Sequence, residues 1–181
     1  KMYLSFFLLN TFFLVLTAAV MVLITETKNF LATSSEKILL IAVSILTVGL
    51  SQFVIVPYDI SSYFFLMLFF LFLLKYLNEN STGQLIILGT IVLISTLNRE
   101  SSALSISLAA TLLLAKFGLR KQTAVSVAVL GISFLVAYVG MRLMNGNFST
   151  SDGNLLVQNF TQPKNILGLL FGAVFFVFPF L

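Results

Sequence analysis

Long apolar runs separated by short polar stretches constrain this chain more than any other feature of its sequence. The hydrocarbon core of a lipid bilayer is about 30 Å thick, and about 20 helical residues are needed to cross it. Within that core the backbone has to satisfy its own hydrogen bonds, so runs of this kind predict helices. The predicted fold class is therefore all-α, a polytopic transmembrane helical bundle of about seven spans.

The composition excludes a water-soluble domain. The chain is 59% hydrophobic and 9% charged, with a mean hydropathy of +1.09, whereas soluble domains are about 45–50% apolar and about 25% charged. We expect residues 1–181 to form a single transmembrane domain. Because the chain starts at Lys1 and stops within an apolar run, we also expect it to be a piece of a longer membrane protein.

The absence of cysteine and histidine removes several kinds of chemistry. Disulfides, thiolate or imidazole metal sites, and Cys/His or Ser/His catalysis all need one of these residues. No cofactor is predicted; carboxylates leave a divalent cation open, but no motif indicates one. The net charge is +4, and the basic residues lie in short loops, where such residues set membrane orientation. The expected partner is therefore the lipid bilayer and not nucleic acid.

The predicted spans alternate in direction across the membrane. They cover residues 2–24, 38–56, 60–77, 85–97, 103–118, 123–144 and 166–181. Pro57 ends the second span because it cannot donate the helical hydrogen bond, and Asp59 is well placed to cap the third span. The fourth span is short unless it takes residues from both flanks.

The fourth and fifth spans could instead be one helix over residues 85–117, which would be about 50 Å long. That helix would bury Arg99 and Glu100 in mid-bilayer, where a charged residue costs about 2.5–3.5 kcal/mol. We therefore predict a helical hairpin with residues 98–102 at its tip.

The distribution of basic residues predicts the orientation. Six of the ten lie at the ends of the first, third and fifth spans or in the loops after them: Lys28, Lys37, Lys75, Lys116, Arg120 and Lys121. Cytoplasmic loops carry such an excess, so we place this side in the cytoplasm and the protein in a cell membrane, namely a bacterial inner membrane. The alternation of the spans then brings Asp59, residues 98–100 and Arg142 to the outer face.

Two acids and two arginines on that face form the predicted site. Glu100 and Asp59 are the predicted catalytic residues, because a partly desolvated carboxylate can act as a general base toward a hydroxyl. Arg99 and Arg142 are predicted to bind phosphate through the planar guanidinium, with Asn98 as a further substrate-binding residue. The alternative stays open that Asp59 is only a helix cap, Arg99 and Glu100 a solvated tip, and Arg142 an interfacial anchor.

Two short motifs carry a resemblance to a known class. Pro57-Tyr58-Asp59 opens an aromatic-rich span, and Leu97-Asn98-Arg99-Glu100-Ser101 lies between two apolar helices. Over residues 57–116 this layout resembles bacterial multispan proteins similar to the GT-C class of membrane glycosyltransferases. The resemblance implies sugar transfer at the outer face from a donor linked to a polyprenyl-phosphate carrier lipid. The class usually has a catalytic acid in its first external loop, and none precedes the first span here.

Three functions follow as hypotheses. The first is an integral-membrane glycosyltransferase of cell-envelope polysaccharide or glycolipid synthesis. The second is a transporter or flippase of a lipid-linked or anionic substrate, which would use the same arginines for binding alone. The third is a non-catalytic membrane subunit, in which all four charged residues would tolerate alanine.

Overall fold

The computed structural model describes residues 2–28, 32–50 and 60–145, and every regular element among them is helical. The all-α prediction is therefore confirmed for this part of the chain. Contacts divide the chain into two compact units, Lys1–Met141 and Arg142–Leu181, and each is considered by itself. The single-domain assignment stays a prediction, and the seventh predicted span, residues 166–181, lies outside the described residues.

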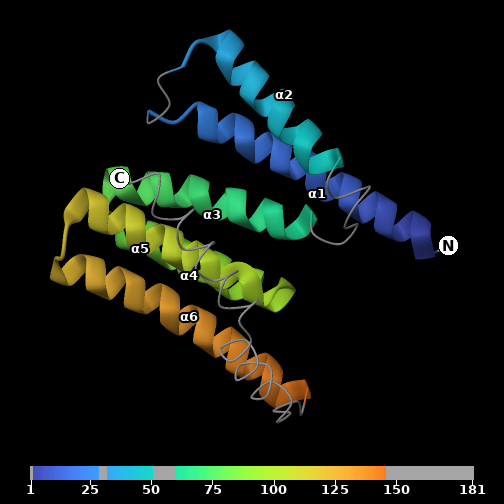
Figure 1. Ribbon diagram of the computed structural model, residues 1–181. Helices are drawn as coiled ribbons and strands as arrows, with labels where there is room; N and C mark the ends of the chain where they lie inside the picture. Colours follow the sequence, from blue (N-terminus) through green and yellow to red (C-terminus); the bar gives the residue numbers. More distant parts are fainter. Residues whose placement is uncertain (1, 29–31, 51–59, 146–181) are drawn as a thin grey trace, which may run out of the picture. The chain divides into compact units, whose positions relative to one another are not determined.

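The helices follow the predicted spans closely (Figure 1). They are α1 (Met2–Thr25), α2 (Ser34–Leu50), α3 (Ile60–Glu79), α4 (Thr82–Asn98), the short 3₁₀ helix η2 (Glu100–Ser102), α5 (Ala103–Phe117) and α6 (Lys121–Asn145). In the described residues, four stretches are long and apolar enough to cross a membrane: Phe7–Thr25, Ile60–Glu79, Glu100–Phe117 and Lys121–Met144. The total of seven spans stays a prediction.

α2 begins earlier than the sequence prediction, at Ser34 instead of residue 38. The reason is a capping box formed by Thr33 and Glu36. The Thr33 amide and hydroxyl both donate to Glu36 Oε2 at 2.8 Å, and the Glu36 amide donates back to Thr33 Oγ1 at 3.4 Å. These bonds satisfy amides that the first turn of a helix otherwise leaves unpaired.

The predicted break between the fourth and fifth spans is confirmed. α4 ends at Asn98, and Arg99 is extended, with φ −160° and ψ 136°. Two contacts with α3 show that the chain reverses there. Asn98, at the end of α4, hydrogen-bonds to the first turn of α3. The Lys116 ammonium, near the end of α5, donates to the carbonyl oxygen of Leu77 at the other end of α3. α4 and α5 are thus antiparallel neighbours and not one long helix.

α3 lies at the centre of the apolar core of the first unit. It packs against α1, α4 and α5, and α6 contributes to the same core through Leu130. The largest core side chains that are almost fully buried are Phe69, Leu73, Leu88, Val92, Leu113 and Leu130. Large apolar side chains remain exposed on α1, α2, α4, α5 and α6, as expected for helices in contact with a lipid bilayer.

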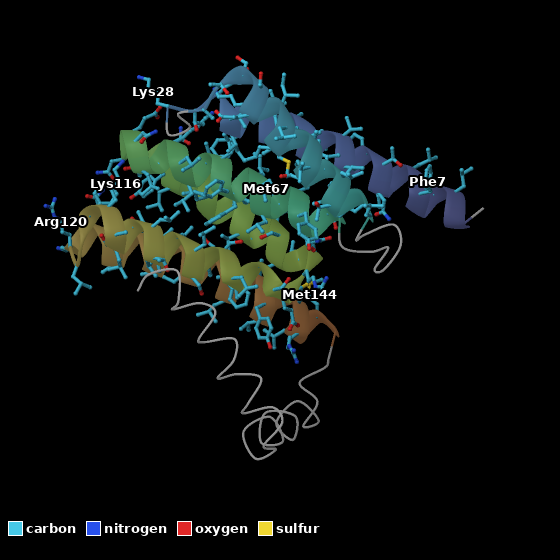
Figure 2. The ribbon with its side chains drawn as sticks, turned by 45° about the horizontal axis from the view of Figure 1, so that its top comes forward. Phe7, Lys28, Met67, Lys116, Arg120 and Met144 are labelled. Atoms are coloured by element: carbon cyan, nitrogen blue, oxygen red, sulfur yellow. The ribbon has the colours of Figure 1, made fainter. Side chains whose placement is uncertain are left out.

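Basic residues gather at one end of the first unit. Figure 2 shows Lys28, Lys116 and Arg120 at the end where α1 and α5 finish, while Phe7 lies near the opposite end of α1. This grouping agrees with the alternation used to predict orientation. The side of the membrane on which this end lies stays a prediction.

Candidate functional site

A pocket of about 280 Å³ lies at the end of the helices opposite Lys28, Lys116 and Arg120. Three elements enclose it: the first turns of α3, the last turn of α4 with Arg99, and η2 with the start of α5. Its lining residues are Ser62, Tyr63, Phe65, Leu66, Ser95, Arg99, Ser101, Ser102, Leu104 and Ser105. We call this the Arg99 pocket.

The lining combines one guanidinium with a group of hydroxyls. Five serines and Tyr63 line the pocket, and Arg99 is the charged residue among its described lining residues. Ser95 and Ser105 are buried, whereas Arg99 and Ser101 are exposed. Hydroxyls and guanidinium groups are hydrogen-bond donors, so the pocket suits an anionic or oxygen-rich ligand.

Side-chain hydrogen bonds hold the pocket together at its polar end. Asn98 Nδ2 donates to Ser62 Oγ at 3.2 Å, and Ser61 Oγ donates to Asn98 Oδ1 at 3.1 Å. The Thr96 and Ser102 hydroxyls lie 2.8 Å apart and join α4 to η2. These pairs link all three elements that enclose the pocket.

Of the five predicted site residues, Arg99 lines the pocket, and the other four are not among its described lining residues. Glu100 is exposed at the start of η2, directly after Arg99, and the Asn98 side chain bonds to α3. Arg142 is half-buried in the last turn of α6 but belongs to the second unit, so its predicted place near Arg99 stays a prediction. Asp59 lies outside the described residues.

Sequence reasoning missed the serines of the pocket. Ser95 precedes Arg99 by four positions, and Ser105 follows Ser101 by four. Residues four apart share a face within one helix, so this spacing is a weak signal, because Arg99 is extended and lies outside α4. Ser62 and Tyr63 could not have been found in this way, because they come from α3, more than thirty positions earlier.

The described residues contain no cluster of three or more acidic, histidine or cysteine side chains that could hold a metal ion. No family model, curated protein or solved structure matches this chain. The resemblance to membrane glycosyltransferases therefore stays a prediction.

Proposed function

We propose that this chain is part of an integral-membrane glycosyltransferase that binds the phosphate of a lipid-linked sugar donor in the Arg99 pocket. One observation carries the proposal: Arg99 and six hydroxyl-bearing residues line a single pocket at the ends of apolar helices. Arginine binds phosphate by charge and by paired hydrogen bonds. Neutral hydroxyls can donate to the oxygens that the guanidinium does not reach.

The apolar part of the lining supports a lipid rather than a water-soluble phosphate. Phe65, Leu66 and Leu104 border the same pocket, and Leu104 is 63% exposed on α5. A ligand with a charged head and a hydrocarbon chain would match both parts of the lining. The head would lie near Arg99, and the chain would follow the apolar surface of the helices.

Transfer of the sugar would break its bond to the phosphate oxygen and form a bond to an acceptor hydroxyl. The departing phosphate gains negative charge, which the Arg99 guanidinium would stabilise. The acceptor hydroxyl loses its proton to a carboxylate acting as general base. Glu100, adjacent to Arg99 and exposed, is the proposed base among the described residues, with Asp59 as its alternative.

A second function, transport or flipping of a lipid-linked anion, is favoured by the character of the lining. Arginine, serine and tyrosine are binding groups. Glu100 follows Arg99 in the sequence but is not one of the described lining residues of the pocket. A flippase would need these binding groups and no general base. It would move the ligand across the membrane without forming a covalent product.

Ser101 provides the test of ligand binding, because it is exposed and lines the pocket. The chain has no native cysteine, so a single Ser101→Cys substitution can be labelled with a membrane-impermeant maleimide in intact cells. We expect labelling from outside, and protection by added polyprenyl phosphate. The matched control is Ser81→Cys, an equally small change at an exposed position between α3 and α4.

The two positions give opposite expectations. Ser81→Cys should react from the cytoplasmic side only and should not be protected by the lipid. If added polyprenyl phosphate did not reduce the labelling of Ser101→Cys, a phosphate site in the pocket would be refuted. Sugar transfer by the full-length protein that survives both Arg99→Ala and Glu100→Gln would refute the enzyme, whereas lipid protection without any transfer would favour the flippase.

A further inference from the structure

Asn98 lies where the Arg99 pocket is assembled. It is the last residue of α4, Arg99 follows it directly, and Ser62 on α3 forms part of the opposite wall. The backbone connects α3 to α4 at the other end of both helices, between Glu79 and Thr82. At the pocket end, the two helices are therefore held by side chains.

The Asn98 amide uses both of its polar atoms for this purpose. Its Oδ1 accepts from Ser61 Oγ at 3.1 Å, and its Nδ2 donates to Ser62 Oγ at 3.2 Å. The two serines are consecutive residues in the first turn of α3. A side-chain amide carries an acceptor and a donor side by side, so one Asn98 can engage both hydroxyls at once.

Arg99 is held on its other side as well. Its amide donates to the Ser95 carbonyl at 2.8 Å, and its carbonyl accepts from the Ser102 amide at 3.2 Å. The hydroxyls of Thr96 and Ser102 pair across the same bend. The extended Arg99 backbone is thus fixed to α4 and η2, and Asn98 adds the attachment to α3.

We propose that Asn98 is a positioning residue: it fixes Arg99 relative to α3, while the ligand contacts are made by Arg99 and not by the Asn98 amide. The proposal deepens the proposed function and rests on it for the identity of the ligand. Its distinguishing consequence concerns Ser61, which bonds to Asn98 but is not one of the described lining residues of the pocket. Loss of Ser61 should weaken ligand binding although Ser61 does not touch the ligand.

The first experiment is a double-mutant cycle on the full chain in nanodiscs, with a photoreactive long-chain isoprenyl monophosphate as probe. Asn98→Ala and Ser61→Ala should each lower labelling by about five-fold, as expected for the loss of one or two hydrogen bonds. The double variant should be little worse than Asn98→Ala, because both changes break the same link. Thr90→Ala is the control, since the exposed Thr90 hydroxyl donates to the Ile86 carbonyl of its own helix. Full labelling of Ser61→Ala with loss in Asn98→Ala would overturn the proposal and make Asn98 a ligand contact.

A second experiment replaces the link by a different chemical group. In the cysteine-free chain, Ser61→Cys with Asn98→Cys can be joined by a short, reducible bismethanethiosulfonate. We expect the joined protein to recover labelling toward the wild-type level and to lose it again on reduction. A joined protein that stays as weak as the reduced one would show that the Asn98 amide itself is needed, and would overturn the proposal.

If the proposed function is wrong, the labelling result differs from the one expected when only the role of Asn98 is wrong. If the wild-type protein is not labelled by the lipid phosphate, the function is wrong, but hydrogen exchange without ligand still tests the role of Asn98. Exchange of the Arg99 and Ser102 amides should rise in Asn98→Ala and in Ser61→Ala, and should not change in Thr90→Ala. Unchanged exchange in the first two variants would overturn the positioning role.

Discussion

The hydroxyls of Tyr76 and Ser126 lie 2.7 Å apart in the apolar interior and join α3 to α6 across 50 positions of sequence. Tyr76 is 3% exposed and Ser126 1% exposed. Ser126 also donates its proton to the Gln122 carbonyl at 2.9 Å, so the Tyr76 phenol is the donor of the pair. Two buried polar side chains thus satisfy each other in the apolar interior.

This arrangement predicts unequal effects of removing either partner. Tyr76→Phe should cost about 0.5–1 kcal/mol of unfolding free energy, because Ser126 keeps its bond to Gln122. Ser126→Ala should cost about 1–3 kcal/mol, because it leaves the Tyr76 hydroxyl buried without this acceptor. Unfolding in increasing dodecyl sulfate, followed by circular dichroism, measures both values.

Thr90→Val is the control for the hydroxyl pair. Thr90 is exposed and its hydroxyl bonds within α4, and valine has nearly the same shape, so its effect should be close to zero. Equal losses in Tyr76→Phe and Ser126→Ala would contradict the assignment of the phenol as donor.

The helices could be predicted from the sequence because the membrane leaves few alternatives. Apolar runs of bilayer length require helices, and the charges of Arg99 and Glu100 place a break inside what would otherwise be one overlong helix. The predicted start of α2 was wrong by four residues, and the reason is local. Thr33 and Glu36 form a capping box, a signal that hydropathy alone does not register.

The site could be predicted only in part. Arg99 stands out in the sequence because a charged residue between apolar helices needs a reason. Serines do not stand out in this way, since Ser95 or Ser105 in a membrane helix can simply bond to its own backbone. Ser62 and Tyr63 reach the pocket through the packing of α3 against α4, which residue spacing within one helix does not determine.

A close approach between α4 and α6 at Gly89 gives the second prediction. A β-carbon at Gly89 would meet Ser133 Oγ at 3.0 Å, and Ser133 is tied to the Val129 carbonyl at 3.0 Å. Gly89→Ala should therefore destabilise the fold by about 1–3 kcal/mol, measured in the same dodecyl sulfate titration. Small residues at such crossings let membrane helices pack closely.

Two further variants test the cause of this loss. Gly131→Ala on α6 is the matched control, because a β-carbon there meets nothing within 4 Å; it should be neutral or stabilise by up to about 1 kcal/mol through helix propensity. Combining Gly89→Ala with Ser133→Ala should restore part of the lost stability. If Gly89→Ala changed the unfolding free energy no more than Gly131→Ala does, the close contact would be disproved.

The start of α2 should depend on pH through Glu36, which lies on the polar side of the apolar run. Hydrogen bonds from the Thr33 amide and hydroxyl stabilise the carboxylate and lower the pKa of Glu36 from its ordinary value of 4.5. A lowered pKa in the folded state means that this stabilisation is complete above pH 4.5 and is lost as the pH falls through the lower, folded value. Nuclear magnetic resonance of the Thr33 amide should show the transition below pH 4.5.

Two substitutions test whether the Thr33 amide reports the titration of Glu36. Glu36→Gln should make the Thr33 amide insensitive to acid while keeping most of the capping geometry, because glutamine also serves in a capping box. Thr33→Val should bring the pKa of Glu36 closer to its ordinary value, since the hydroxyl bond is lost. A Thr33 amide that titrates above pH 4.5 would contradict the sign of this shift.

The last prediction separates the geometry of Arg99 from its charge. Arg99→Lys keeps the charge but loses the planar fork of donors, so labelling by a photoreactive isoprenyl monophosphate should fall partway. Arg99→Ala should lower it by about ten-fold or more, the range expected when a charged hydrogen bond to the ligand is removed. Arg120→Ala removes an equal charge at the exposed turn between α5 and α6, at the other end of α5, and should leave labelling unchanged. If Arg120→Ala and Arg99→Ala reduced labelling equally, the lipid would be responding to net charge, and the pocket at Arg99 would not be its site.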